Sequence, residues 1–158
     1  MSFTDEEIER YARHLVLREV GGPGQQKLKG SSVLIVGAGG LGAPASLYLA
    51  AAGVGTIILA DPDEVDRSNL QRQVIYAEDD LGRAKVDAAA DRLHALNPHV
   101  FVAGFNGALE PSNADELVEG VDLVLDGTDS FSVRFAVNAA CVRHGKPLVS
   151  GAIGRWTG

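Results

Sequence analysis

The stretch that most constrains the fold runs from Val33 to Asp61 and reads VLIVGAGGLGAPASLYLAAAGVGTIILAD. A short apolar run leads into a glycine-rich turn, small apolar residues follow, and a second apolar run ends at an acid. This order predicts a strand, a turn, a helix and a second strand tipped by Asp61, which is the arrangement of a nucleotide-binding βαβ unit. Proteins that bind NAD, FAD or ATP all use such turns, so the motif leaves the nucleotide open.

The residue types of this unit explain how it can hold a nucleotide. Its turn contains Gly37, Gly39, Gly40 and Gly42. Glycine lets the backbone bend sharply and approach a phosphate, and the start of the following helix offers unpaired N–H groups to the anion. Asp61, at the tip of the second strand, can accept hydrogen bonds from ribose hydroxyls.

A membrane span is the alternative interpretation of the same region, because residues 31–60 carry no charged side chain. A spanning helix needs about 20 consecutive apolar residues. Glycines at two separate turns interrupt this run, and they favour the strand–turn–helix interpretation.

Composition limits the remaining possibilities. The chain has 158 residues without a linker, which predicts a single domain with a helical segment at residues 1–30 and a nucleotide-binding domain at residues 31–158. The net charge of −7 argues against general nucleic-acid binding. Cys141 is the one cysteine, which leaves no intrachain disulfide and no cysteine-rich zinc site. The polar, acidic N-terminus lacks the apolar core of a signal peptide, so we expect a cytoplasmic protein that does not enter the membrane.

The N-terminal segment has the pattern of a helix. Thr4 and Glu7 have capping-box spacing, and Gly21-Gly22-Pro23-Gly24 is expected to end the helix before a short helical piece at residues 25–29. Its buried face is expected to consist of Ile8, Ala12 and Leu15. Arg13 lies off that face, and the residues alone favour a solvated surface charge.

A polar segment follows the acid-tipped strand. Ser68 and Gln71 have capping-box spacing, which predicts a short helical turn. In such a turn Asn69, Arg72 and Gln73 share one face. Two amides and a guanidinium beside a nucleotide form a plausible phosphate clamp, since arginine matches phosphate oxygens in bidentate fashion. An ordinary polar helix face is the alternative.

The next helix is predicted over residues 83–96, and it places Lys85 in its first turn. The helix dipole disfavours a cation there, which hints at a function. Neutralisation by the acidic residues just upstream is an equal alternative; these are Glu78, Asp79 and Asp80. The expected buried stripe of this helix consists of Val86, Ala89, Leu93 and Leu96.

The second half of the chain predicts further strands at residues 100–105, 121–126 and 147–150, with helices at 112–119 and 131–144. The continuous apolar run at 121–126 is typical of a parallel sheet covered on both faces. Asp129 follows it, at the sheet edge where the glycine turn lies. A carboxylate there suits Mg²⁺ that bridges ATP phosphates. The simpler alternative is that Asp129 or Thr128 caps the following helix, and one residue can do both. The predicted class is α/β, a Rossmann-like doubly wound, mostly parallel sheet with helices on both faces.

Several segments together resemble one known family. They read RYARHLVL at 10–17, GAGGLG at 37–42, DPDEVDRSNLQRQ at 61–73, GRAK at 82–85, LNP at 96–98, DGTD at 126–129 and NAAC at 138–141. Over nearly its whole length, the chain is similar to the ThiF/MoeB/HesA family, the prokaryotic relatives of ubiquitin-activating enzymes. The SNLQRQ block is more specific than the glycine motif.

The resemblance implies an adenylyltransferase. Such enzymes bind ATP and Mg²⁺ and transfer AMP to the C-terminal glycine of a ubiquitin-like sulfur-carrier protein that ends in Gly-Gly, in pathways of the molybdopterin or thiamine type. It also implies a homodimer. Family members continue beyond the equivalent of Gly158 and often carry zinc-binding cysteine pairs there, so we expect no zinc ligands in this chain.

The resemblance also assigns roles by position. It implies that Asp61 holds the ribose and that Asp129 supports the magnesium. It implies that Arg13 reaches the phosphates across the homodimer interface. The implied phosphate contacts are Asn69, Arg72 and Lys85. The implied nucleotide site also includes the four turn glycines, Asp63 and Gln73, and the implied catalytic residues are Arg13, Arg72, Lys85 and Asp129.

Three alternatives remain beside this function. The same fold can activate a carboxylate bound to tRNA, or the chain can be a non-catalytic or truncated nucleotide-binding module. An NAD-dependent dehydrogenase would explain residues 37–61 but would leave Asn69, Arg72 and Lys85 without a role.

Overall fold

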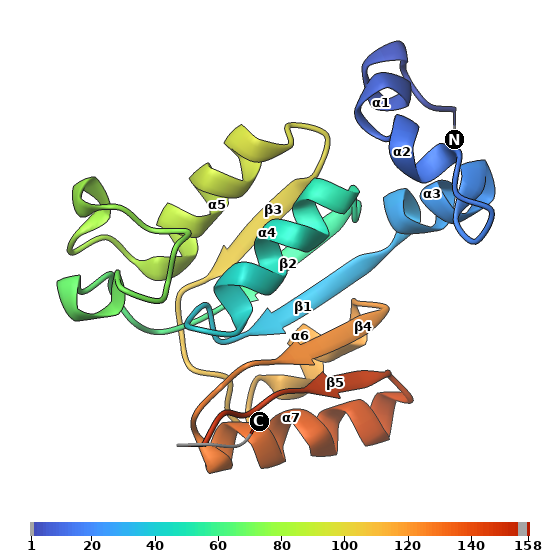
Figure 1. Ribbon diagram of the computed structural model, residues 1–158. Helices are drawn as coiled ribbons and strands as arrows, with labels where there is room; N and C mark the ends of the chain where they lie inside the picture. Colours follow the sequence, from blue (N-terminus) through green and yellow to red (C-terminus); the bar gives the residue numbers. More distant parts are fainter. Residues whose placement is uncertain (1, 155–157) are drawn as a thin grey trace.

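The computed structural model describes residues 2–154 and 158, which form a five-stranded parallel sheet with the strand order β3-β2-β1-β4-β5 (Figure 1). All four pairs of neighbouring strands are parallel. The strands are β1 Ser32–Val36, β2 Thr56–Ala60, β3 Phe101–Phe105, β4 Leu123–Asp126 and β5 Leu148–Ser150. The predicted doubly wound class is confirmed.

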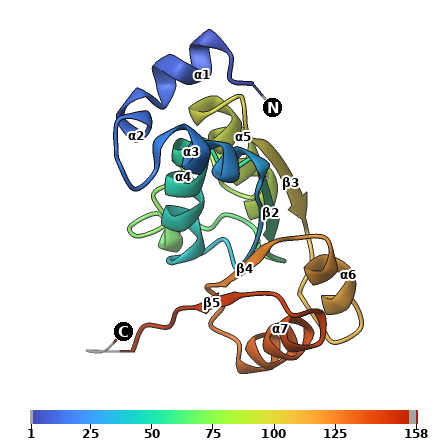
Figure 2. The same cartoon turned by 90° about the vertical axis from the view of Figure 1, so that its right-hand side faces the viewer.

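Helices cover both faces of this sheet (Figure 2). On β1, Val33 and Ile35 pack into one core with helices α4 and α5, while Leu34 and Val36 pack into a second core with α6 and α7. Alternate side chains of a strand point to opposite faces, which explains why the run is apolar throughout. The helices are α1 Asp5–Arg10, α2 Ala12–Leu15, α3 Gly21–Gly30, α4 Gly42–Ala52, α5 Lys85–Leu96, α6 Ala114–Glu119 and α7 Phe131–His144, with the 3₁₀ turns η1 Arg67–Asn69 and η2 Glu78–Asp80.

The uncharged stretch of residues 31–60 is divided between β1, α4 and β2. Its one helix, α4, has 11 residues, well short of the roughly 20 that a bilayer requires. Within the part of the chain that the structure describes, no helix has the length and apolar character needed to cross a membrane.

The predicted buried face of the N-terminal helix is wrong. The capping box between Thr4 and Glu7 is present, but Ile8 is 48% exposed, and Glu7 and Tyr11 are buried in its place. The helix breaks between Arg10 and Ala12, so the expected single stripe does not continue. Polar Glu7 and Tyr11 can be buried because each has a hydrogen-bonding partner: Lys29 of α3 for Glu7, and Asn97, after α5, for Tyr11.

Two other helix predictions need correction. The segment Gly21–Gly24 opens α3 instead of ending a helix; Gly21 has a φ of +56°, and Pro23 lies in the first turn, where its missing N–H costs nothing. Leu96, predicted to be buried, is 37% exposed because it is the last residue of α5. Its carbonyl accepts a hydrogen bond of 3.0 Å from Arg10 Nη1.

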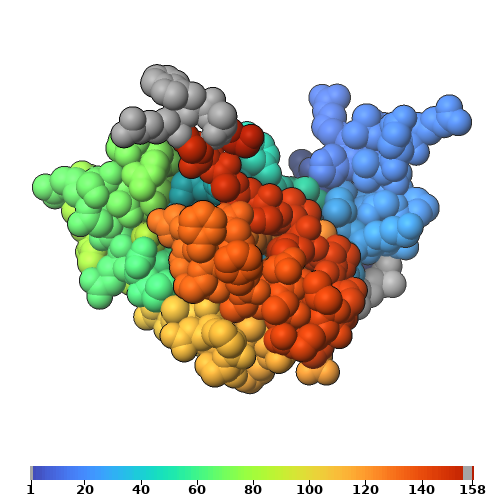
Figure 3. Space-filling view, turned by 90° about the horizontal axis from the view of Figure 1, so that it is seen from below, coloured from blue at the N-terminus to red at the C-terminus, as the bar shows by residue number. Residues whose placement is uncertain are grey.

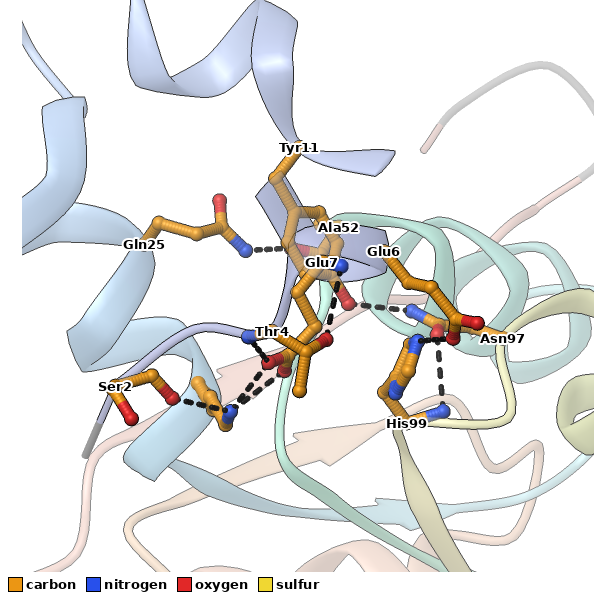
Figure 4. A network of polar contacts seen from close by, with 10 residues as sticks. Ser2, Thr4, Glu6, Glu7, Tyr11, Gln25, Ala52, Asn97 and His99 are labelled. Carbon is orange, nitrogen blue, oxygen red and sulfur yellow. Dashed lines mark hydrogen bonds and ion pairs between the residues drawn. The ribbon is translucent and has the colours of Figure 1, made fainter. Parts of the chain in front are cut away.

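A buried polar network attaches α1–α3 to the end of α4 (Figure 4). Asn97 Nδ2 donates to Tyr11 Oη at 2.8 Å and to the Ala50 carbonyl at 2.7 Å, and Gln25 Nε2 donates to the Ala52 carbonyl at 2.8 Å. Gly53 makes room for the tyrosine, because a Cβ at this position would lie 2.5 Å from the ring. The network thus holds α1–α3, and with them Arg13 of α2, in place on the sheet domain.

Glu7 joins α1 to α3 and gives the packing of these two helices a testable pH dependence. Its carboxylate lies 2.7 Å from Lys29 Nζ. Burial alone raises the pKa of Glu7, but the bonds from Lys29 and the Thr4 amide outweigh burial and hold it below its ordinary value. A lowered folded-state pKa stabilises the fold above the unfolded-state pKa, and this contribution disappears as the pH falls through the folded-state pKa.

We therefore expect Glu7→Gln to lower the free energy of unfolding by about 2 kcal/mol at pH 7. This difference from the wild type should shrink as the pH falls below about 4.3. Urea denaturation at several pH values measures it, and Glu9→Gln, on the exposed side of α1, is the matched control with little effect at any pH. A deficit that is the same at pH 7 and pH 3 would contradict the role of the charged carboxylate.

Candidate functional site

A cleft of about 1290 Å³ opens at the carboxyl ends of the strands. In Figure 3 the teal segment after β1 lies between the green segment that follows β2 and the red segment that follows β5. The sequence-predicted residues that line the cleft are Gly37, Gly39, Gly40, Asp61, Asp63, Asn69, Arg72, Gln73, Lys85 and Asp129. Apolar side chains such as Leu109 and Phe131 line other parts of it. The structure thus brings the predicted residues together, with Gly42 and Arg13 as the exceptions.

Two glycines of the turn, Gly37 and Gly42, cannot be replaced without straining the backbone. Gly37 has a φ of +88°, a conformation that side chains disfavour. A Cβ on Gly42 would lie 1.8 Å from the Gly37 carbonyl oxygen, so glycine is needed for α4 to start directly against the turn. Gly42 therefore shapes the site from behind the turn without lining the cleft.

Gly39 and Gly40 differ from these two. A Cβ at either position would meet only ordinary contacts, at 3.5 Å from Gln73 Nε2 and at 3.7 Å from Arg72 Nε. The chain's own packing does not require glycine at these positions. Their missing side chains leave the floor of the cleft bare beside the N-terminus of α4, where an anion is favoured.

Asp61 helps to hold the glycine turn. It is 5% exposed, and its two carboxylate oxygens accept hydrogen bonds from the Ala38 amide at 2.7 Å and from the Asp63 amide at 2.9 Å. Tyr76 Oη donates to the Ala38 carbonyl at 2.8 Å. Burial, with Asp61 nearby, raises the pKa of Tyr76 well above its ordinary value, so it remains a donor. Each Asp61 oxygen keeps a second lone pair for a hydroxyl in the cleft.

The predicted cap of the next segment is wrong, although its shared face is confirmed. Asp66 caps η1 by accepting from the Ser68 amide at 2.7 Å, and Gln71 does not close a capping box. The amides of Arg72 and Gln73 both donate to the Asn69 carbonyl, at 3.1 and 2.9 Å. This turn presents the three side chains to the cleft.

Two of these side chains have unused hydrogen-bonding capacity. Gln73 is 3% exposed, and its Oε1 has no hydrogen-bonding partner among the described residues. The Arg72 guanidinium approaches the Ser68 carbonyl at 3.5 Å and forms no ion pair with a described acidic side chain. A buried unpaired polar atom such as Gln73 Oε1 is costly, so it commonly finds its partner in a ligand or ordered water, whereas the exposed Arg72 guanidinium is simply open to a ligand.

Lys85 lies in the first turn of α5 with its side chain 5% exposed. Its Nζ lies 2.8 Å from Asp63 Oδ2, and the Asp63 side chain is 64% exposed. The alternative of neutralisation by Glu78, Asp79 or Asp80 is therefore wrong, because Asp80 pairs with Arg83 instead. A buried cation whose partner is open to solvent can also be reached by an anion in the cleft.

Asp129 lies in the turn after β4 and is exposed to the cleft. Its carboxylate forms no hydrogen bond or ion pair with another described residue, so the capping alternative is wrong for Asp129. Thr128 Oγ1 instead accepts from the Ser130 amide at 3.2 Å. The described chain contains no cluster of three carboxylate, imidazole or thiol ligands. A single free carboxylate fits Mg²⁺, which proteins often hold through one or two carboxylates together with substrate phosphates.

Arg13 does not reach this cleft within one chain. It is exposed on α2, and α3 leads directly into the amino end of β1, whereas the cleft lies at the carboxyl ends (Figure 1). A five-residue strand is about 16 Å long. Arg13 and the cleft therefore lie at opposite ends of the strands.

Sequence reasoning assigned no role to Arg134, which also lines the cleft. Its guanidinium contacts the turn before α7 and the segment after β5. The available signal was its place four residues after Ser130, in the first turns of a helix that starts at the cleft. Asp126, the last residue of β4 and the first of the DGTD motif, is 0% exposed and was likewise given no role.

The fold and the cleft define a nucleotide-binding α/β protein. The chain belongs to the ThiF family, whose model matches residues 11–158. The family resemblance is thereby confirmed.

Curated relatives cover almost all of this chain. It is 54% identical over 153 residues to the probable adenylyltransferase/sulfurtransferase MoeZ of Mycobacterium tuberculosis, and the match covers 97% of this chain and 39% of that protein. It is 48% identical to the sulfur carrier protein adenylyltransferase of Thermus thermophilus, with 100% of this chain and 58% of that protein covered. The chain thus spans between about two fifths and three fifths of the length of these two relatives.

A solved structure of similar fold contains the nucleotide. The E. coli tRNA N6-threonylcarbamoyladenosine dehydratase TcdA in complex with ATP matches with a TM-score of 0.89 at 30% identity. This match covers 98% of the chain and 65% of TcdA.

Proposed function

We propose that this chain is the nucleotide-binding part of an ATP-dependent adenylyltransferase that activates the C-terminal glycine carboxylate of a ubiquitin-like sulfur-carrier protein in the cytoplasm. The observation that carries the proposal is the convergence of Arg72, Lys85 and Asp129 on the glycine turn. A dinucleotide site needs the turn and Asp61, but it gives these three side chains no role. An ATP phosphate chain with its metal gives a role to each.

The reaction moves an adenylyl group between two anions. An oxygen of the carrier carboxylate attacks the α-phosphorus of ATP, the bond from that phosphorus to the bridging oxygen breaks, and pyrophosphate leaves with the electron pair. The carboxylate is already ionised, so no general base is required. The barrier is lowered by positioning and by positive charge around the phosphates.

The residues of the cleft divide this work. The lone pairs of Asp61 that the backbone amides do not use accept hydrogen bonds from the ribose hydroxyls. The phosphates bind over the backbone of Gly39 and Gly40, where no side chain is in the way. Arg72 and Lys85 balance the phosphate charge, and Asn69 and Gln73 supply amides beside them. Asp63 releases or shares Lys85 when the nucleotide enters. Asp129 holds Mg²⁺, which when bound neutralises phosphate charge.

The names of the relatives favour a protein carrier over tRNA. MoeZ and the Thermus enzyme, at 54% and 48% identity, are named as adenylyltransferases, the second of a sulfur carrier protein. TcdA, named for a tRNA modification, is 30% identical. The net charge of −7 also disfavours a tRNA substrate.

We further propose that the enzyme works as a homodimer with a carrier that ends in Gly-Gly. The surface around Arg13 supports this, since Val16 and Leu17 are 80% and 49% exposed beside it. Burying such apolar side chains against a second copy is favourable, and a two-fold axis would bring each Arg13 to the other copy's cleft.

Asp129→Asn tests the metal role. We expect carrier-dependent exchange of radiolabelled pyrophosphate into ATP to fall by about 100-fold or more, because the magnesium loses its protein carboxylate. The assay uses candidate ubiquitin-fold carriers from the gene neighbourhood, and each carrier without its last glycine is the negative control. Asp79→Asn, an exposed acid outside the cleft, should keep wild-type exchange. Exchange that survives Asp129→Asn would refute the metal role, and exchange absent from the wild type with every carrier would favour a non-catalytic module.

Mixing inactive variants tests the cross-subunit role of Arg13. Arg13→Ala and Arg72→Ala should each lose exchange activity, and their co-expression should restore about a quarter of the wild-type rate, since half the dimers then contain one intact site. The matched control pairs Arg72→Ala with Asp129→Asn; both residues belong to the same chain's cleft, so no activity should return. A stable monomer in light scattering, or no recovery in the first mixture, would overturn the role of Arg13.

A further inference from the structure

We propose that Arg134 is a positioning residue for Asp129: it fixes the turn after β4 against the end of β5 and so sets where the magnesium carboxylate points. The inference rests on the proposed metal role of Asp129. Its basis is a multidentate contact of one guanidinium with two segments of the chain that lie far apart in sequence.

The contacts of Arg134 reach both sides of the turn. Nη2 donates to the Thr128 carbonyl at 2.7 Å and to the Gly151 carbonyl at 3.0 Å. Nη1 donates to Ser150 Oγ at 2.7 Å and lies 3.5 Å from Asp126 Oδ2. Arg134 therefore bonds the residue directly before Asp129 and, through the same group, the end of β5.

Asp126 completes this arrangement from inside the sheet. Its side chain is 0% exposed, and it accepts from the Thr128 amide at 3.0 Å and from Ser150 Oγ at 2.7 Å. The Gly151 amide donates to the Asp126 carbonyl at 2.9 Å. A buried carboxylate needs a compensating charge, and Arg134 is the one described cation within ion-pairing distance of it.

Asp129 has no such support of its own. Its carboxylate has no partner among the described residues, so its direction depends on the backbone of the turn. Two hydrogen bonds hold that backbone. Before Asp129, the Thr128 carbonyl accepts from Arg134, and after it, the Ser130 amide donates to Thr128 Oγ1. Residues that orient a metal ligand commonly change metal affinity by roughly 10-fold to 100-fold when they are replaced.

Replacing Arg134 by lysine keeps the positive charge but removes the planar shape of the guanidinium. Arg134→Lys keeps a cation beside Asp126, so the buried carboxylate retains a counter-charge. A lysine ammonium cannot reproduce the planar fork that bonds Thr128 and Gly151 together. Arg134→Lys should therefore fold and leave the turn loosely held.

Titration calorimetry with ATP tests this role, in excess Mg²⁺ and again with the metal removed by EDTA. Arg134→Lys should lower the affinity for ATP in Mg²⁺ by roughly 10-fold or more and leave the affinity in EDTA within about 2-fold of the wild type. Asp129→Asn should remove the magnesium preference, and adding Arg134→Lys to Asp129→Asn should cause no further loss, because both act through one ligand.

Arg143→Lys is the matched control, since Arg143 lies on the same helix and pairs with Asp115 away from the cleft. It should bind ATP as the wild type does under both conditions. If Arg134→Lys lost the same affinity for ATP in Mg²⁺ as in EDTA, its role would be purely structural and the inference would be overturned. A variant with the same magnesium preference as the wild type would also overturn it. If the wild type itself shows no magnesium preference, the proposed metal role of Asp129 fails, and the inference fails with it.

Discussion

The site depends on the close approach of α4 to the turn after β1. Only a hydrogen at Gly42 fits against the Gly37 carbonyl, where a Cβ would lie 1.8 Å from the oxygen. This contact places the helix N-terminus directly behind the turn. Asp61, which follows β2, then accepts a hydrogen bond of 2.7 Å from the Ala38 amide, so the ends of the neighbouring strands β1 and β2 are joined at this edge of the sheet. Every other cleft residue is positioned relative to that edge.

Charges around the cleft are arranged with few fixed partners. Lys85 is buried, yet its partner Asp63 is mostly exposed, and Arg72 and Asp129 form no ion pair with described residues. The exposed charges of Arg72 and Asp129 contribute little to stability, and the buried Lys85 has only an exposed partner, so the convergence of the three on one cleft is better explained by a charged ligand. The pair of buried Asp126 and partly exposed Arg134 differs, because it lies beside the turn and holds the backbone on which the direction of Asp129 depends.

The sequence predicted the sheet well, because apolar runs and glycines act locally on the backbone, and most of the predicted site residues lie together at one cleft. Helix α7 was predicted at 131–144 and is Phe131–His144. The N-terminal face was wrong because Glu7 and Tyr11 are buried through long-range partners that periodicity cannot show. The Asp63–Lys85 pair and the contacts of Arg134 were missed for the same reason: they join residues 22 and up to 17 positions apart.

The residues around the cleft favour ATP over a dinucleotide as its ligand. The most direct measurement is titration calorimetry of the wild-type chain with ATP in the presence of Mg²⁺ and, separately, with NAD. We expect saturable binding of one ATP per chain and an affinity for NAD at least about 100-fold weaker, a difference of about 2.7 kcal/mol. Binding of NAD as tight as that of ATP would contradict this expectation.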